Sequence, residues 1–174
     1  KRLTFVIAGG GATGVELAGA LAELKNKILP KDYPDLDIRK MQIHLVEGSD
    51  RLLASMSQKA SEKAERFLKK LGINVWTSMI VDDYNGESVR MKDGMEIPTK
   101  TLIWAAGVRA NPIEGFNSED FDRDRFIVDN QCQLIHHGGV YALGDVASLT
   151  PENATRPLPM LASVAMQQGK YLAK

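Results

Sequence analysis

Apolar and polar positions in the first part of the chain alternate in blocks that predict strand, helix and strand. Residues 3–8 form a nearly continuous apolar and β-branched run, which is typical of a strand buried on both faces of a parallel sheet. Glycines interrupt the run, and residues 14–25 repeat apolar side chains at helical spacing. Residues 25–40 are polar and contain two prolines, so we expect the helix to end and a surface excursion to follow. A second strand is predicted at 42–46.

The rest of the chain predicts a second helix and then mostly short strands. The helix runs to Leu71 before the stop residue Gly72, and either Ser55 or Ser57 caps its beginning. From Ile73 the hydrophobic period becomes two, with Asn-Gly and Asp-Gly turns that are typical of hairpins. Strands are expected at 73–76, 79–84, 88–91, 101–106, 126–128 and 140–143, a linker or exposed loop at 111–125, and a last helix from about Met160.

Composition narrows the class of protein to a soluble globular one. The 174 residues include 22 Lys and Arg against 22 Asp and Glu, so the net charge is 22 − 22 = 0, which excludes a general nucleic-acid binder. The single cysteine, Cys132, excludes an intrachain disulfide framework and a cysteine-based zinc cluster. No apolar run reaches the ~20 residues of a membrane span. Because the chain begins at Lys1 without methionine and enters a strand at once, we expect a piece of a larger protein.

The strongest chemical motif is Gly9-x-Gly11-x-x-Gly14, between the first strand and the first helix. Gly9 permits the tight turn, Gly11 lets the backbone approach a pyrophosphate, and Gly14 lets helix and strand pack closely. The helix N-terminus adds free N–H groups and a partial positive charge. Because the motif has its strand–turn–helix context, it predicts a dinucleotide site. A P-loop is excluded, since Val15-Glu16 stands in place of Lys-Ser/Thr.

Glu47 ends the second strand, where a carboxylate can accept hydrogen bonds from both ribose hydroxyls of a dinucleotide. It follows Gly14 by 47 − 14 = 33 residues, more than the usual ~20, and the polar excursion at 25–40 accounts for the excess. A carboxylate at this place repels a 2′-phosphate, so the sequence favours NAD(H) over NADP(H). Arg51, close by in the sequence, leaves NADP(H) open.

Other chemistry-bearing residues are open to more than one interpretation. Glu16, in the first turn of the helix, either satisfies the helix dipole or lies near the nicotinamide. Gly144-Asp145 could bind ligand hydroxyls such as those of a ribityl chain, but Gly-Asp turns are common. His44 alternates with apolar neighbours and is expected to be a packed sheet residue, and His136-His137 to form a turn. Neither a Ser-His-Asp set nor a metal-ligand spacing stands out, so we predict no metal site.

Together these motifs resemble those of the two-dinucleotide-binding-domain flavoproteins, and among them the type II NADH dehydrogenases, which are single-subunit NADH:quinone oxidoreductases. The stretches that carry the resemblance are 6–18 (VIAGGGATGVELA), 44–47 (HLVE), 104–109 (WAAGVR), 140–147 (VYALGDVA) and 165–169 (AMQQG). The resemblance implies an α/β fold: a Rossmann-like NAD-binding domain with a parallel sheet and a β-meander crossover at 1–109, and a partial FAD-binding lobe at 110–174.

By this resemblance, NADH would pass a hydride to FAD, and the electrons would go on to a quinone. Cofactor contacts would come from Gly9, Gly10, Gly11, Ala12, Thr13, Gly14 and Glu47, and from Ala106 and Gly107 at the crossing between domains. Glu16 would be the catalytic residue where NADH meets the flavin, Gly144 and Asp145 would bind FAD, and Gln167 and Gln168 would line the quinone pocket. The whole protein would associate peripherally with the cytoplasmic face of the membrane, and a homodimer is allowed. The fragment alone is expected to bind NADH, to retain little FAD and to be inactive.

One departure concerns the electron acceptor. Ser163 stands where the family pattern Ala-Gln-x-Ala-x-Gln-Gln-Gly has its first glutamine. A related flavoprotein reductase with a disulfide, ferredoxin or peroxide acceptor is the nearest alternative, although the CxxC that thioredoxin reductases carry in the NAD domain is absent. A non-catalytic NAD-binding redox sensor is the alternative from another class. A methyltransferase ranks last, because it would leave Gly144-Asp145 without a role.

Overall fold

The computed structural model describes residues 3–111 and 113–174, and the chain divides into two compact units, Lys1–Gly107 and Val108–Lys174. The sequence placed this boundary slightly later, after Arg109. The first unit has hydrophobic cores on both sides of its central sheet, and the second has a core of its own. Each unit is therefore described by itself below.

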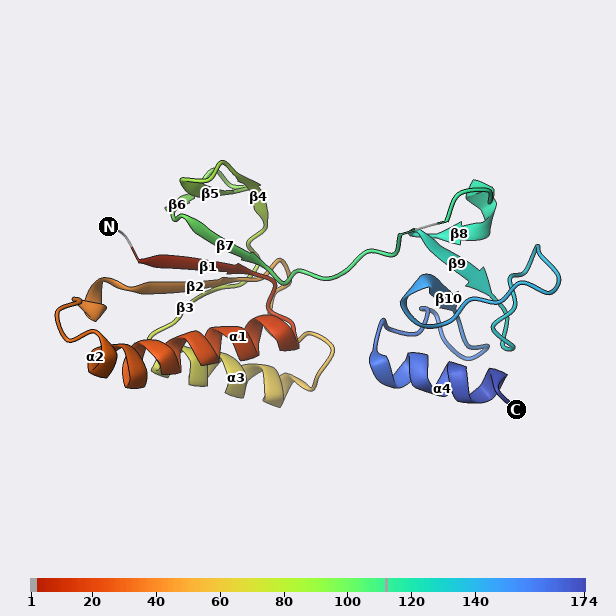
Figure 1. The fold of residues 1–174 in the computed structure, drawn as a ribbon, viewed down its shortest axis with the longest axis horizontal. Helices are drawn as coiled ribbons and strands as arrows, with labels where there is room; N and C mark the ends of the chain where they lie inside the picture. Colours follow the sequence, from red (N-terminus) through yellow and green to blue (C-terminus); the bar gives the residue numbers. More distant parts are fainter. Residues whose placement is uncertain (1–2, 112) are drawn as a thin grey trace. The chain divides into compact units, whose positions relative to one another are not determined.

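A parallel four-stranded sheet of order β3-β2-β1-β7 forms the centre of the first unit. Its strands are β1 (Thr4–Ala8), β2 (Gln42–Val46), β3 (Asn74–Trp76) and β7 (Thr101–Trp104). The helices α1 (Ala12–Glu23) and α3 (Gln58–Lys70) cover one face, and the antiparallel strands β4 (Val81–Tyr84), β5 (Ser88–Met91) and β6 (Glu96–Pro98) lie over the other (Figure 1). The predicted α/β fold with a parallel sheet and a β-meander is confirmed.

Both faces of the central sheet are buried, which explains the continuous apolar run at the start of the chain. Ile7 and Leu45 belong to the core under the helices, whereas Val6 and Val46 belong to the core under the antiparallel strands. Successive side chains of a strand point to opposite faces, so a strand covered on both sides must be apolar at nearly every position. The buried sheet then leaves the ends of its strands as the places where polar chemistry can occur.

The chain stays helical beyond Lys25, so the predicted end of the first helix is wrong, although residues 25–40 lie at the surface as expected. A π-helical turn (Leu24–Ile28) and then α2 (Leu29–Asp32) follow α1 directly. Pro30 lies in the first turn of α2, directly after the π-helical turn, whose last hydrogen bond runs from the Leu29 N–H to the Leu24 carbonyl, so the chain stays helical up to and through the proline. The path back to β2 includes a short 3-10 helix, Ile38–Lys40.

The ends of α3 follow from local side-chain chemistry. Of the two serines that the sequence offered, Ser57 is the N-cap, and its hydroxyl accepts a hydrogen bond from the Ala60 N–H at 3.3 Å. Gly72 follows the helix with φ of +85°, a left-handed conformation that favours glycine. The strand β6 was not predicted, and it pairs with β5 after the turn that contains Gly94.

The second unit contains a three-stranded sheet of order β10-β9-β8 and the helix α4 (Ala162–Leu172). The strands are β8 (Phe121–Asp122), β9 (Arg125–Val128) and β10 (Ala147–Leu149), with 3-10 helices at Ser118–Asp120 and Gly144–Val146. The strand expected at 140–143 is wrong, because Tyr141 makes only an isolated bridge with Gln133. A strand needs a hydrogen-bonded neighbour along its length, and the described residues give this segment one at a single position.

The segment 111–125 is not simply an exposed linker, as the sequence suggested. It includes the 3-10 helix Ser118–Asp120 and β8, while residue 112 lies outside the described part of the chain. Phe116 and Phe121 pack on the core of the second unit, where Phe116 lies 4.8 Å from Phe126 between ring centroids. Two aromatic rings bury enough apolar area to anchor a segment that is otherwise charged.

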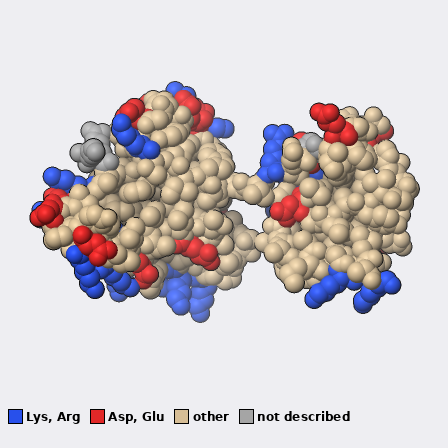
Figure 2. Space-filling view, in the orientation of Figure 1, with Lys and Arg blue, Asp and Glu red and all other residues tan. Residues whose placement is uncertain are grey.

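The surface carries both signs of charge. On the face shown in Figure 2, Lys and Arg side chains lie among Asp and Glu side chains rather than in one basic patch. In the part of the chain that the structure describes, the helices are too short or too polar to cross a membrane.

Candidate dinucleotide-binding site

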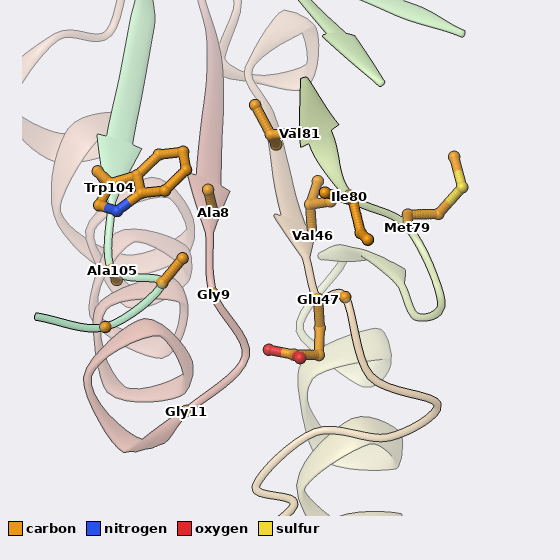
Figure 3. A pocket seen from close by; sticks show the side chains of 13 residues that line it. Ala8, Gly9, Gly11, Val46, Glu47, Met79, Ile80, Val81, Trp104 and Ala105 are labelled. Carbon is orange, nitrogen blue, oxygen red and sulfur yellow. The ribbon is translucent and has the colours of Figure 1, made fainter. Parts of the chain in front are cut away.

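A pocket of about 510 Å³ lies at the carboxyl ends of β1, β2 and β7 in the first unit. Its lining comes from the glycine turn, the end of β2, the connection from β3 to β4 and the end of β7 (Figure 3). The lining residues are Ala8, Gly9, Gly11, Val46, Glu47, Gly48, Met79, Ile80, Val81, Trp104, Ala105, Ala106 and Gly107. Ligands of open parallel α/β sheets bind outside the carboxyl ends of the strands, so the pocket is where this fold places a ligand.

The glycines of the turn meet three different steric demands. Gly9 has φ of +110°, and a Cβ there would lie 2.4 Å from the Ala105 carbonyl oxygen. A Cβ on Gly14 would lie 1.8 Å from the Gly9 carbonyl oxygen, so only glycine allows the helix to start this close to the strand. A Cβ on Gly11 would meet no atom within 4 Å. Gly9 and Gly14 are therefore dictated by packing, whereas Gly11 borders open space.

The helix α1 begins at this open space. Gly11 is its N-cap, and the Val15 N–H makes the first i to i−4 hydrogen bond to the Gly11 carbonyl at 3.0 Å. The N–H groups of Ala12, Thr13 and Gly14 thus have no acceptor within the helix. Ala12 and Thr13 are exposed. These groups and the positive end of the helix dipole form a setting that suits an anion such as a pyrophosphate.

Glu47 lies beside the same turn and points toward it (Figure 3). Its Oε2 accepts a hydrogen bond from the Gly10 N–H at 2.5 Å, and its Oε1 accepts one from the Ser49 N–H at 2.7 Å. The Ser49 hydroxyl also donates to Oε1. Partial burial acts to raise the pKa of Glu47, but the hydrogen bonds from Ser49 and Gly10 outweigh it and hold the pKa below its ordinary value. The carboxylate is therefore charged at neutral pH.

Gly10 makes this contact possible. A Cβ on Gly10 would lie 2.6 Å from Leu52 Cδ2 and 2.8 Å from Glu47 Cβ, so a side chain there would push the turn away from β2. Arg51, whose closeness in the sequence left NADP(H) open, donates from Nη2 to the Ala54 carbonyl at 2.9 Å. The acid and not the arginine lines the pocket.

The rest of the pocket is apolar, and sequence reasoning missed most of it. Met79, Ile80 and Val81 lie on one side, and Trp104 lies on the other (Figure 3). Trp104 is 62% exposed although it ends a strand of the central sheet. The sequence signal that could have found it is a tryptophan near the end of a predicted strand, directly before Ala105-Ala106-Gly107. Such a wall suits the flat rings of a dinucleotide.

Not every residue that the sequence singled out reaches this pocket. Glu16 is exposed on α1 and borders an apolar groove between α1 and α3, together with Phe67, rather than the pocket. The structure thus brings Gly9, Gly11 and Glu47 together with Ala106 and Gly107, but leaves Glu16 outside.

His44 is a buried sheet residue, as the alternation predicted. Its Nδ1 accepts a hydrogen bond from the Trp76 Nε1–H at 3.1 Å, and burial lowers the pKa of its imidazole. It is therefore neutral and does not line the candidate pocket.

The predicted residues of the second unit gather around one short turn. Asp145 is exposed in the 3-10 helix Gly144–Val146. The Gly144 N–H donates to Gln168 Oε1 at 2.7 Å, and Gln168 is buried on α4 while the neighbouring Gln167 is exposed. Gln168 therefore supports the turn, and Gln167 remains the accessible amide of the pair.

The comparisons with known proteins agree with this geometry. Residues 1–169 match the model of the pyridine nucleotide-disulphide oxidoreductases. The chain belongs to this family. Within the pyridine nucleotide-disulphide oxidoreductases, it is 33% identical over 175 residues to a probable NADH dehydrogenase of Dictyostelium discoideum, and 31% identical over 176 residues to a type II NADH:quinone oxidoreductase of Haemophilus influenzae. Each alignment covers 100% of this chain but only 38% and 39% of those relatives.

Two solved structures share the fold. The structure of NDH2 from Plasmodium falciparum in complex with NADH matches with a TM-score of 0.74 and 25% identity, over 87% of this chain and 33% of that chain. A putidaredoxin reductase, solved as a covalent complex with putidaredoxin, matches with a TM-score of 0.72 and 18% identity, over 98% and 39% of the two chains. The resemblance to type II NADH:quinone oxidoreductases inferred from the motifs is confirmed.

Proposed function

We propose that this chain binds NADH and forms part of a flavoprotein that passes electrons from NADH through FAD to a quinone. The observation that carries the proposal is the pocket in which an open glycine turn and a charged Glu47 meet. The turn offers N–H groups to a pyrophosphate, and the carboxylate offers an acceptor to a ribose hydroxyl. The names of the similar proteins, an NADH dehydrogenase and NADH:quinone oxidoreductases, support the choice of dinucleotide and acceptor.

In this proposal the chain positions the dinucleotide and does not react with it. Gly9, Gly10, Gly11, Ala12, Thr13, Gly14, Glu47, Ala106 and Gly107 would hold NADH, with the first unit as the NAD-binding domain. Trp104 and the wall formed by Met79 and Ile80 would exclude water from the rings. FAD, when bound, supplies the hydride acceptor and passes electrons on.

In the second unit, the turn at Gly144-Asp145 is suited to a contact with FAD. The exposed carboxylate of Asp145 suits the hydroxyls of a ribityl chain, and the Gly144 N–H is already used by Gln168. We assign the second unit to part of the FAD-binding domain, with Gln167 and Gln168 near the quinone. A role for Glu16 at the flavin requires that the flavin contacts the exposed side of α1, where Glu16 lies. We infer that the whole protein associates peripherally with a membrane, on its cytoplasmic face, where it would meet a quinone, and a homodimer would be compatible.

Isothermal titration of this chain with NADH and NADPH tests the dinucleotide. We expect NADH to bind more tightly, because the charged Glu47 carboxylate repels a 2′-phosphate. The substitution Glu47→Gln should weaken NADH binding by about tenfold, since a charged acceptor is lost. It should also reduce the preference for NADH over NADPH. Asp50→Asn, which neutralises an exposed acid in the same loop, is the matched control and should change neither. Equal or tighter binding of NADPH to the unsubstituted chain would contradict the proposal.

The acceptor is tested separately on the whole protein, of which this chain is a part, loaded with FAD. NADH oxidation is followed with a short-chain quinone, a ferredoxin, a small disulfide or a peroxide as the only acceptor. We expect turnover with the quinone. Turnover with the disulfide, ferredoxin or peroxide alone would assign the protein to another reductase, and NADH binding without turnover would favour a sensor.

A further inference from the structure

Ser49 contributes two of the hydrogen bonds that surround the Glu47 carboxylate. Its N–H and its hydroxyl both donate to Oε1, and the Gly10 N–H donates to Oε2. The hydroxyl also lies 3.5 Å from the Arg51 carbonyl, but its contact with Glu47 is the shorter of the two. Both Ser49 and Glu47 are half-buried. The hydroxyl of Ser49 is thus committed to the carboxylate in the ligand-free protein.

These donors limit what Glu47 can still accept. A carboxylate has about four acceptor positions, two on each oxygen. Ser49 fills both positions on Oε1, and Gly10 fills one on Oε2. The acceptor capacity that these donors leave is on Oε2, where a ligand hydroxyl could donate.

The backbone around Ser49 is held independently of its hydroxyl. The Ser78 N–H donates to the Ser49 carbonyl at 2.7 Å, and the Met79 N–H donates to the Glu47 carbonyl at 2.9 Å. The connection between β3 and β4 thus holds the backbone of the loop after β2 by two hydrogen bonds. Removing the Ser49 hydroxyl should leave the loop and the two backbone N–H donors of Ser49 and Gly10 in place, and should loosen the Glu47 side chain by the loss of one hydrogen bond.

The freedom of the Glu47 side chain to move affects how well the pocket distinguishes a ribose 2′-hydroxyl from a 2′-phosphate. A glutamate side chain has three rotatable bonds, and an untethered carboxylate can swing away from an approaching phosphate. A carboxylate that is held by hydrogen bonds cannot swing away, so it must repel a 2′-phosphate that enters the pocket. Rejection of a wrong ligand depends on such a fixed repulsive group. We propose that Ser49 is a positioning residue that fixes the Glu47 carboxylate and so makes the pocket select a ribose 2′-hydroxyl over a 2′-phosphate. The proposal rests on the proposed function, because it assumes that a dinucleotide binds here.

The test compares Ser49→Ala with Ser49→Thr, which keeps a hydroxyl, and with Ser55→Ala, an exposed serine in the same loop region. Titration calorimetry gives the ratio of NADPH to NADH dissociation constants for each chain. Ser49→Ala should reduce this ratio by about tenfold, since it removes a hydrogen bond to a charged group. Ser49→Thr and Ser55→Ala should keep the ratio of the unsubstituted chain.

A second readout needs no ligand. The carboxyl carbon of Glu47, followed by NMR against pH, should show a higher pKa in Ser49→Ala, because the hydroxyl that lowers it is gone. An unchanged ratio in Ser49→Ala would overturn the proposal whatever the pKa does. A ratio that falls equally in Ser49→Thr would also overturn it. If the unsubstituted chain bound no NADH, the proposed function itself would fail.

Discussion

Two glycine-containing turns, one in each unit, differ in how their surroundings hold them. In the turn from Gly9 to Gly14, backbone approaches backbone so closely that a side chain would overlap main-chain atoms. At Gly144 the constraint is milder: φ is +66°, and a Cβ would lie 3.1 Å from the Ala165 Cβ. The first turn borders a pocket formed entirely by its own unit, whereas the second exposes Asp145 and depends on one side chain, Gln168. Where main-chain atoms meet, as at Gly9 and Gly14, a side chain cannot be added without moving the backbone, whereas a turn held by one side chain can be weakened by changing that side chain.

The largest expected effect is at the first turn. Gly14→Ala places a methyl group on the Gly9 carbonyl, and we expect the first unit to lose about 3 kcal/mol or more of its free energy of unfolding. Gly19→Ala on the same helix is the control, because a Cβ there meets no atom within 4 Å. It should stabilise the unit by about 0.5–1 kcal/mol. Urea denaturation followed by circular dichroism measures both, and similar stabilities for the two variants would contradict the steric argument.

The second turn should respond more weakly and more locally. Gln168→Met removes the acceptor of the Gly144 N–H while keeping the size of the side chain. It should lower the free energy of unfolding of the second unit by about 1–3 kcal/mol. Hydrogen exchange at the Gly144 amide should become faster. Gln167→Met, one position earlier and exposed, should leave that exchange rate unchanged. Equal rates in the two variants would mean that Gln168 does not hold the turn.

The smallest expected difference is in acid sensitivity. Burial lowers the pKa of His44 from its ordinary 6.5, so its contribution to the stability of the first unit is complete above pH 6.5 and is lost as the pH falls through the lowered value. In the second unit, hydrogen bonds from His137 and His136 to the buried carboxylate of Asp120 lower its pKa from the ordinary 3.8. Its contribution is complete above pH 3.8 and is lost below it.

Amide exchange resolved by residue, measured between pH 7 and pH 3, can separate the two units. The contribution of His44 should decline first and that of Asp120 later. His44→Asn should flatten the first decline, and Asp120→Asn the second. If the stability of both units declined at the same pH and neither substitution altered that decline, groups other than His44 and Asp120 would control the acid sensitivity of both units.

Much of the first unit was predictable because its signals are local. The buried strands, the glycine turn and Glu47 were found from hydrophobic runs and residue spacing, and the parallel sheet followed from them. The helical continuation through Pro30 was missed, because whether a proline breaks a helix depends on the turn that it occupies. The strand expected at 140–143 failed for the opposite reason: its composition suits a strand, but pairing depends on a partner elsewhere in the chain.

The candidate site divides in the same way. Sequence alone determined the chemistry, namely the glycines that must approach a neighbouring backbone and the acid that ends β2, because a residue's steric size and charge belong to the residue itself. Only the tertiary structure decided the rest: that Gly10 and Ser49 hold Glu47, that Met79, Ile80 and Trp104 wall the pocket, and that Glu16 lies outside it. These relations join segments far apart in the chain, and their geometry is set by the packing of the sheet against its two covering layers.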